Sequence, residues 1–214
     1  MRGARIDCCN GLRNAPARMR PLLLIVLLCL CESVAFAQAP PNHEIDIRVE
    51  KNGPANVVDA SFFVPATPQQ AWEVLTDWNN LAGFMTNIKA SSIVSQSGNT
   101  ARVKQTGRAK LWPFSFDIEI EREIELFPFE KMQFRLLGGD FDKMEGELHL
   151  VAEPAGTRIV SHTESIPKFW IPPLIGPIMI EREMRDQFRE IIEEILRRAA
   201  VKNAVPEAGD GEKK

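Results

Sequence analysis

The sequence lacks most of the groups that usually carry enzyme chemistry. It contains no tyrosine, and all four of its cysteines lie within the first 37 residues. It has no Gly-rich phosphate loop, no G-x-S-x-G nucleophile motif and no group of residues at the spacing of a metal site. The chain beyond residue 37 therefore has no disulfide and no thiol nucleophile. We expect no cofactor, no metal and no recognisable catalytic residue.

Long apolar runs are also absent after the N-terminal segment. In that segment, arginines precede an apolar run at residues 22–30, and Ala35-Phe36-Ala37 follows it. This order is typical of a cleavable signal peptide, and the run is about half of the roughly 20 residues that a membrane-spanning helix needs. We expect a signal peptide over residues 1–37, with Met19 as an alternative start. The protein is then exported and periplasmic, with cleavage near Ala37.

An excess of basic side chains is absent as well. The chain has 26 Lys and Arg against 29 Asp and Glu, and five of its arginines lie before residue 37. The remaining domain is therefore distinctly acidic, and it has no basic stripe. Such a charge balance disfavours binding to nucleic acid, so we expect no nucleic-acid partner.

Alternating apolar and polar residues predict an antiparallel sheet. A first strand starts at Ile45, and residues 57–64 form a second strand or continue the first. Thr67-Pro68-Gln69-Gln70 then has the pattern of a capping box that starts a short helix, and Asp77 starts a second one. Six further strands, joined by short turns, are predicted at residues 88–95, 100–110, 114–126, 131–137, 141–151 and 157–166.

A long helix over residues 178–200 follows the last strand. It is the only predicted element long enough to cover the apolar face of the sheet. We therefore expect one α+β domain over residues 44–202, in which a strongly curved sheet grips this helix around a packed core or a cavity. Residues 38–43 are expected to form a linker, and residues 203–214 a disordered tail. The apolar stripe of the helix consists of Ile180, Met184, Phe188, Ile191 and Ile195, at spacings of four and three.

Four segments together resemble the polyketide cyclase/dehydrase-like family, which includes the coenzyme-Q-binding START-like proteins of the SRPBCC superfamily. They are AWEVLTDWNNLAGFMTNIKASSIV (71–94), ARVKQTG (101–107), GDFDKMEGELHL (139–150) and GTRI (156–159). The resemblance covers about residues 47–197. It implies a helix-grip (START-like) fold with an interior tunnel for a hydrophobic ligand. The residue pattern itself predicts about seven strands, with two short helices after the first strand.

The strand FSFDIEIEREIEL, residues 114–126, has one exception to its alternation. Its apolar parity includes Phe116, Ile118 and Ile120, but Arg122 falls on the same face. One interpretation is that Arg122 extends to the edge of the sheet or pairs with a carboxylate. The other is that it binds the polar head of an otherwise apolar ligand. Gln105, on the less charged face of its own strand, is a second candidate polar contact.

The last hairpin has a register that the sequence also predicts. If Ala155-Gly156 is the turn, His149 faces His162 on one side of the sheet. Zinc needs three or four ligands, so we interpret the two histidines as part of a polar outer face rather than as a metal site. On the opposite, inner face, Leu148 then faces Thr163, and Ser161 adds a second hydroxyl.

The Pro-rich loop at residues 166–177 is the remaining feature. Phe169, Trp170 and Leu174 are candidates for a gate, for transient contact with a membrane, or for a plug that closes the core. With the resemblance, this predicts an exported protein that carries or sequesters a hydrophobic small molecule such as a lipid, a quinone or a polyketide-like compound. A cyclase or dehydratase acting in the same cavity, and a partner-binding module using the loop, are the alternatives. The expected cavity residues are Gln105, Phe116, Ile118, Ile120, Arg122, Phe134, Leu148, Ser161, Thr163, Met184 and Phe188.

Overall fold

The computed structural model describes residues 45–111 and 113–204. The predicted signal peptide (1–37), linker (38–43) and most of the predicted tail (203–214) lie outside these residues. Among the described helices, none is both long and apolar enough to cross a membrane.

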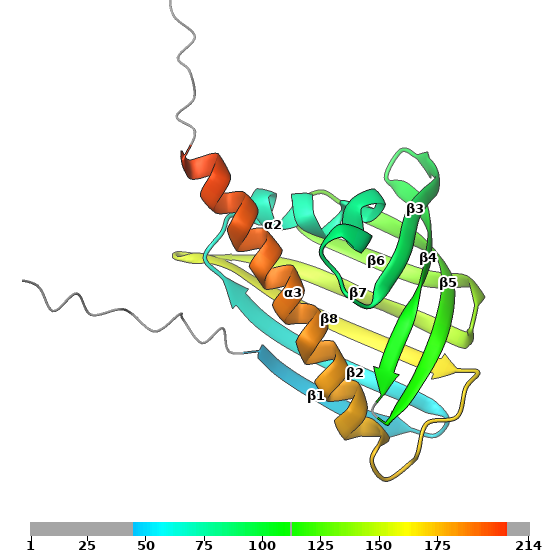
Figure 1. Ribbon diagram of the computed structural model, residues 1–214. Helices are drawn as coiled ribbons and strands as arrows, with labels where there is room; N and C mark the ends of the chain where they lie inside the picture. The colour runs from blue at the N-terminus through cyan, green and yellow to red at the C-terminus, as the bar shows by residue number, and fades with distance from the viewer. Residues whose placement is uncertain (1–44, 112, 205–214) are drawn as a thin grey trace, which may run out of the picture. The chain divides into compact units, whose positions relative to one another are not determined.

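The described residues form an eight-stranded antiparallel sheet and a long C-terminal helix, which lies across one face of the sheet (Figure 1). The strand order is β1-β2-β8-β7-β6-β5-β4-β3, so the chain passes from β2 to the far edge of the sheet through two short helices. The elements are β1 (Ile45–Asn52), β2 (Ala55–Val64), α2 (Pro68–Leu75), η1 (Trp78–Gly83), β3 (Ile88–Ser97), β4 (Thr100–Leu111), β5 (Phe114–Phe127), β6 (Lys131–Gly139), β7 (Phe141–Glu153), β8 (Gly156–Pro167) and α3 (Gly176–Ala204).

This arrangement confirms the predicted helix-grip architecture, with one more strand than expected. The difference arises at Gly53, which has a φ of 58° and lets the chain reverse, so that β1 and β2 form a hairpin instead of one long strand. The capping box is confirmed. The backbone N–H of Gln70 donates to Thr67 Oγ1 at 3.3 Å, and the backbone N–H of Thr67 donates to Gln70 Oε1 at 2.9 Å. The second short helix, η1, is a 3-10 helix.

The two halves of α3 have different surroundings. In the C-terminal half, Ile192 and Ile195 are fully buried in the core. Phe188 is buried at the middle of the helix, where its ring packs 5.0 Å from that of Phe62 on β2. In the N-terminal half, Ile180 and Met184 are only partly buried, although they belong to the same stripe. The helix therefore packs tightly against the sheet at one end and loosely at the other.

Extra residues interrupt the ladder at several places and help the sheet to curve. Lys89 and Val94 are extra residues of β3 relative to β4, and Leu137 is an extra residue of β6 relative to β5. β3 is an edge strand. These bulges also change which way the neighbouring side chains point, which is important for the cavity described below.

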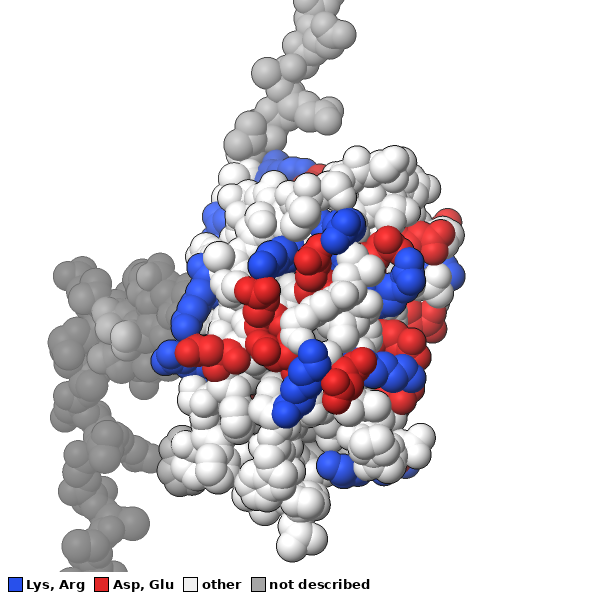
Figure 2. Space-filling model, turned by 90° about the vertical axis from the view of Figure 1, so that its right-hand side faces the viewer, with Lys and Arg blue, Asp and Glu red and all other residues white. Residues whose placement is uncertain are grey.

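The outer face of β5 is acidic, as its alternation predicts, and β4 supplies the opposite charges. Lys104 lies 2.9 Å from Glu119, and Arg108 lies 3.0 Å from Asp117. Figure 2 shows acidic and basic side chains interleaved on this side of the domain. Exposed pairs of this kind contribute little to stability each, so the outer face mainly keeps this side of the sheet solvated.

Candidate functional site

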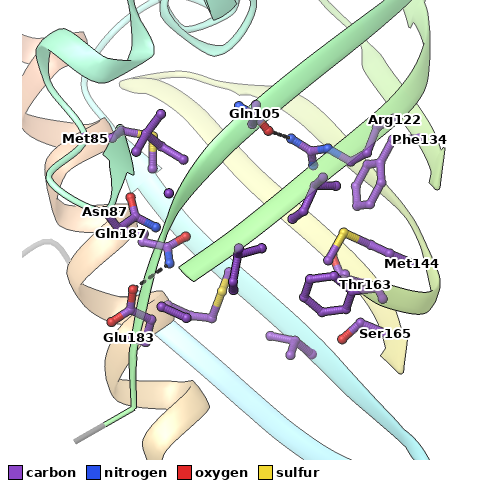
Figure 3. Close-up of a pocket in the computed structure, with 18 of the residues that line it drawn as sticks. Met85, Asn87, Gln105, Arg122, Phe134, Met144, Thr163, Ser165, Glu183 and Gln187 are labelled. Atoms are coloured by element: carbon purple, nitrogen blue, oxygen red, sulfur yellow. Dashed lines mark hydrogen bonds between the residues drawn. The ribbon is translucent and has the colours of Figure 1, made fainter. Parts of the chain in front are cut away.

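A cavity of about 380 Å3 lies between the inner face of the sheet and the N-terminal half of α3. This volume is within the range of small-molecule sites in proteins. The wall is mostly hydrocarbon, with polar side chains at a few positions (Figure 3). The loose packing of Ile180 and Met184 is explained by this space, because both side chains line it.

Most of the predicted cavity residues line this space. They are Gln105, Ile118, Ile120, Arg122, Phe134, Leu148, Ser161, Thr163, Met184 and Phe188. Phe116 is the exception. Its ring stacks on Phe169 of the Pro-rich loop, with the ring centroids 4.5 Å apart, so it supports the wall from outside.

Arg122 lies on the inner face of β5 without a carboxylate partner among the described residues. Its Nη2 group donates a hydrogen bond to Gln105 Oε1, and its guanidinium carbon lies 5.1 Å above the ring centre of Phe134 (Figure 3). Its Nε atom is buried and finds no hydrogen-bond partner in residues 45–111 and 113–204. Arg122 therefore neither pairs with an acid nor extends to the sheet edge, and one of its donors is buried without a partner among the described residues.

Burial dominates the electrostatics of Arg122. Removal from water disfavours the charged form and lowers the pKa of Arg122 to about 10. Since this value is still far above neutral pH, the side chain is a cation under ordinary conditions. Arg122 is one of the residues that line the cavity, and part of its surface stays accessible.

Gln105 holds Arg122 in place. Gln105 pairs with Ile120 and Arg122 with Val103, so the two side chains are diagonal neighbours on the same face of β4 and β5. The Gln105 side chain is almost fully buried, and its amide nitrogen donates to Ser91 Oγ at 3.3 Å. Both ends of the amide are therefore engaged, and the group orients the guanidinium.

The last hairpin differs from its predicted register by two residues. Glu153 pairs with Gly156, so the turn is Pro154-Ala155, and His149 faces Val160 instead of His162. Gly156 is the first residue of β8, and a Cβ atom there would lie 2.2 Å from the Val64 carbonyl oxygen, so the close approach of the two strands requires glycine at this position. A shift of two residues keeps every side chain on its face, so Ser161 and Thr163 still point inward.

The two histidines lie apart on the outer face, each beside an acid. His162 Nδ1 lies 2.7 Å from Asp59 Oδ1, and His149 Nε2 lies 3.2 Å from Glu147 Oε1. The described part of the chain contains no group of three or more potential metal ligands.

The Pro-rich loop divides its apolar side chains between inside and outside. Phe169 lines the cavity and packs on Phe116 and Phe141. Trp170 is 66% exposed and packs edge to face with Phe114, with the ring centroids 6.4 Å apart, while Leu174 is 92% exposed. Phe169 therefore closes the wall, and the other two predicted gate residues form an apolar outer surface.

Sequence reasoning missed a second polar group in the wall, formed by Asn87, Glu183 and Gln187. Gln187 Nε2 donates to Glu183 Oε1 at 3.1 Å. Burial raises the pKa of Glu183, although hydrogen bonds from Gln187 and the Lys110 backbone oppose the shift. Helical spacing could have revealed Glu183 and Gln187, since they flank Met184 on α3. No sequence pattern predicts Asn87, because a bulge in β3 sets its direction.

Comparison with known proteins agrees with this architecture. The profile of the family described as "Polyketide cyclase / dehydrase and lipid transport" matches residues 64–192, and the chain belongs to this family. A search of curated proteins by sequence gives no significant match.

Solved structures with the same fold are distant in sequence. The Zhui aromatase/cyclase from Streptomyces is 17% identical (TM-score 0.57), with 67% of this chain and 95% of that chain covered. A STAR-related lipid transfer protein from Xanthomonas axonopodis is 14% identical (TM-score 0.57), covering 75% and 97%. Human StAR-related lipid transfer protein 5 is 11% identical (TM-score 0.54), covering 85% and 96%. Family and fold together indicate hydrophobic ligand binding or polyketide cyclase-like activity.

Proposed function

We propose that this protein is an exported carrier that binds or sequesters a hydrophobic small molecule, such as a lipid, a quinone or a polyketide-like compound. The observation that carries the proposal is the Arg122 guanidinium, a cation with no carboxylate partner among the described residues, in the wall of a mostly apolar cavity. Apolar burial of about 25 cal/mol per Å2 supplies affinity for the body of the ligand. Arg122 then selects a ligand with a carbonyl or carboxylate oxygen.

The N-terminal arginines, apolar run and Ala-Phe-Ala pattern support export to the periplasm. Exposed apolar side chains around the Pro-rich loop support transient contact with a membrane during ligand exchange. They are Trp170, Leu174, Ile175 and Ile178. The lower end of the domain in Figure 2, where this loop lies in Figure 1, has few charged side chains.

Native mass spectrometry of the protein purified from the periplasm, followed by organic extraction, tests the proposal. We expect a stoichiometric bound compound with an apolar skeleton and at least one carbonyl or carboxylate oxygen. A clean unliganded mass, together with no binding to a panel of lipids, quinones and fatty acids, would contradict it. The mass of the purified chain also shows whether the N-terminal segment has been removed. Its removal would support export, independently of ligand binding.

A cyclase or dehydratase acting in the same cavity is the second candidate. The observation that favours it is Glu183, a cavity carboxyl whose pKa is raised by burial and which could transfer a proton. Arg122→Ala separates the two functions. A carrier loses affinity for its ligand, whereas an enzyme loses turnover of a polyketone substrate.

A further inference from the structure

The inner face of β8 carries a row of hydroxyl groups along the cavity. Ser161, Thr163 and Ser165, here called the hydroxyl row, occupy alternate positions of the strand, and all three line the space. Alternate residues of a strand lie about 6.5–7 Å apart, so the row extends over about 13 Å. The residues paired with Ser161 and Thr163 on β2 and β7 have no polar side chains. They are Ala60, Val58, Leu148 and Gly146.

The same face of β8 has different surroundings at the packed end of the domain. Thr157 lies there, four residues before Ser161, and it is fully buried. Its hydroxyl donates a hydrogen bond to the Ala66 carbonyl oxygen at 2.7 Å. Where this face is enclosed by protein, its hydroxyl therefore has a protein partner. Along the cavity, none of the oxygens of the hydroxyl row makes a hydrogen bond with a described residue.

The hydroxyl row is accessible from the cavity. Its three residues are only partly buried. In the described residues, the enclosed side-chain atoms without a partner are Asn87 Oδ1 and Arg122 Nε, so the oxygens of the row keep accessible surface. Because β8 lies between β2 and β7, its inward side chains are reached from the inner face of the sheet, where the cavity lies. Figure 3 shows Thr163 and Ser165 among the side chains that surround this space.

Asn56 on β2 continues the polar strip beside Ser165. The two residues pair across the strands, so their side chains are neighbours on the inner face. Asn56 is only 4% exposed and lines the cavity, and its amide makes no hydrogen bond with a described residue. A polar side chain this deeply buried usually has a partner, so the partner of Asn56 is expected in the cavity.

We propose that the ligand is an apolar compound with two or more hydroxyl or carbonyl oxygens along one side, and that this side lies against β8. A hydroxyl both donates and accepts, so the row suits either kind of oxygen. A plain hydrocarbon chain would instead remove the row from water and give it no partner. Ile120, Met184 and Phe188 supply hydrocarbon for the rest of the ligand. This inference rests on the proposed carrier function and narrows its ligand class to compounds oxygenated along one side.

Three acids of one chain length test the inference. Calorimetry below the micelle concentration would compare hexadecanoic acid, 16-hydroxyhexadecanoic acid and 10,16-dihydroxyhexadecanoic acid. In a purely apolar cavity each added hydroxyl weakens binding, since it loses water and gains no partner. We expect the opposite order, in which each hydroxyl tightens binding about twofold to tenfold, because the chain can bend to bring its hydroxyls to the row.

Variants assign the preference to the hydroxyl row. The triple variant Ser161→Ala/Thr163→Val/Ser165→Ala removes the three hydroxyls with little change in shape, and it should bind hexadecanoic acid most tightly. Its stability to urea should be close to that of the unmodified protein, since the hydroxyls have no protein partner. Thr163→Val alone should lose part of the preference. Ser61→Ala is the matched control and should keep the full preference, because Ser61 lies on the outer face of β2 and does not line the cavity.

The possible results separate this inference from the carrier function. Equal or tighter binding of hexadecanoic acid by the unmodified protein would overturn the inference while supporting the carrier function. Full retention of the preference in both Thr163→Val and the triple variant would also overturn it. Binding of none of the three acids would contradict the inference and count against the carrier function itself.

Discussion

At the scale of single residues, Arg122 is the clearest exception to the alternation of β5, because it places a charged side chain on the apolar face of the strand. The inner face of β5 is hydrocarbon on both sides of it, and its neighbours supply an amide and an aromatic ring instead of a carboxylate. A buried cation that is not paired costs free energy. A residue that only filled space would avoid this cost, so the guanidinium is best explained by what it binds.

Replacing Arg122 with methionine should separate binding from stability. Methionine keeps the length and apolar packing but removes the charge and the unpartnered Nε. We expect the free energy of unfolding to stay equal or rise by about 1–4 kcal/mol. Affinity for an acidic or carbonyl ligand should fall at least tenfold, since a hydrogen bond to a charged group contributes about 1.5–3 kcal/mol. Urea unfolding and calorimetry measure the two quantities.

The difference in the free energy of unfolding between Arg122→Met and the unmodified protein should change with pH in one direction. The pKa of Arg122 is lowered in the folded state, so the unfolded state binds more protons above about pH 10. The unfavourable contribution of Arg122 is complete below its folded pKa, and it diminishes as the pH rises beyond that value. Any stability advantage of Arg122→Met should therefore shrink in that window. A large destabilisation of the variant at neutral pH would show that Arg122 is structural.

At the scale of elements, α3 is anchored by charges at its well-packed end. Glu194 is only 8% exposed and binds Arg197 at 2.7 Å and Arg198 at 2.6 Å. Arg198 also lies 2.8 Å from Asp77, the residue before η1. This network holds the C-terminal half of the helix, whereas the cavity is lined by residues of the N-terminal half.

Glu194→Gln should destabilise the fold by about 1–3 kcal/mol at neutral pH, because it removes the charge that both arginines share. The arginines lower the pKa of Glu194 to about 2, so its stabilisation is complete above the ordinary glutamate pKa and is lost as the pH falls toward 2. The difference between the two proteins should therefore vanish in acid. Glu193→Gln, at an exposed neighbour, is the control; a difference independent of pH would indicate lost packing instead.

The Pro-rich loop provides a second test at this scale. Trp170→Ala should change the free energy of unfolding by less than about 1 kcal/mol, since the side chain is mostly exposed, and it should change the ligand release rate severalfold. Phe169→Ala, which opens the cavity wall, should instead cost stability. Stopped-flow release of a fluorescent fatty acid measures the rate. Unchanged release with a large loss of stability in Trp170→Ala would show that the loop is a plug.

At the scale of the whole molecule, periodicity predicted the sheet, the long helix and the side of each strand that faces the cavity. The predicted register of the last hairpin was wrong by two residues. Ser161 and Thr163 nevertheless lie on the predicted inner face, because a shift of two residues does not exchange the faces. Phe116 was predicted to line the cavity, and it packs on Phe169 instead. Alternation shows on which face of the strand a side chain lies, but not how far along the strand the cavity extends. Asn87 was missed because its direction depends on a bulge and on the close approach of Gly107, which involve contacts between strands.

The bulges of β3 have a consequence for self-association. β3 is one edge of the sheet, and an open edge is a template on which a strand of another molecule can add. The extra residues Lys89 and Val94 break the regular spacing of hydrogen-bonding groups along this edge, and Lys89 adds a charge. A regular incoming strand could pair over only a short stretch. The bulge that follows Asn87 thus also makes this edge of the sheet a poor template for strand addition.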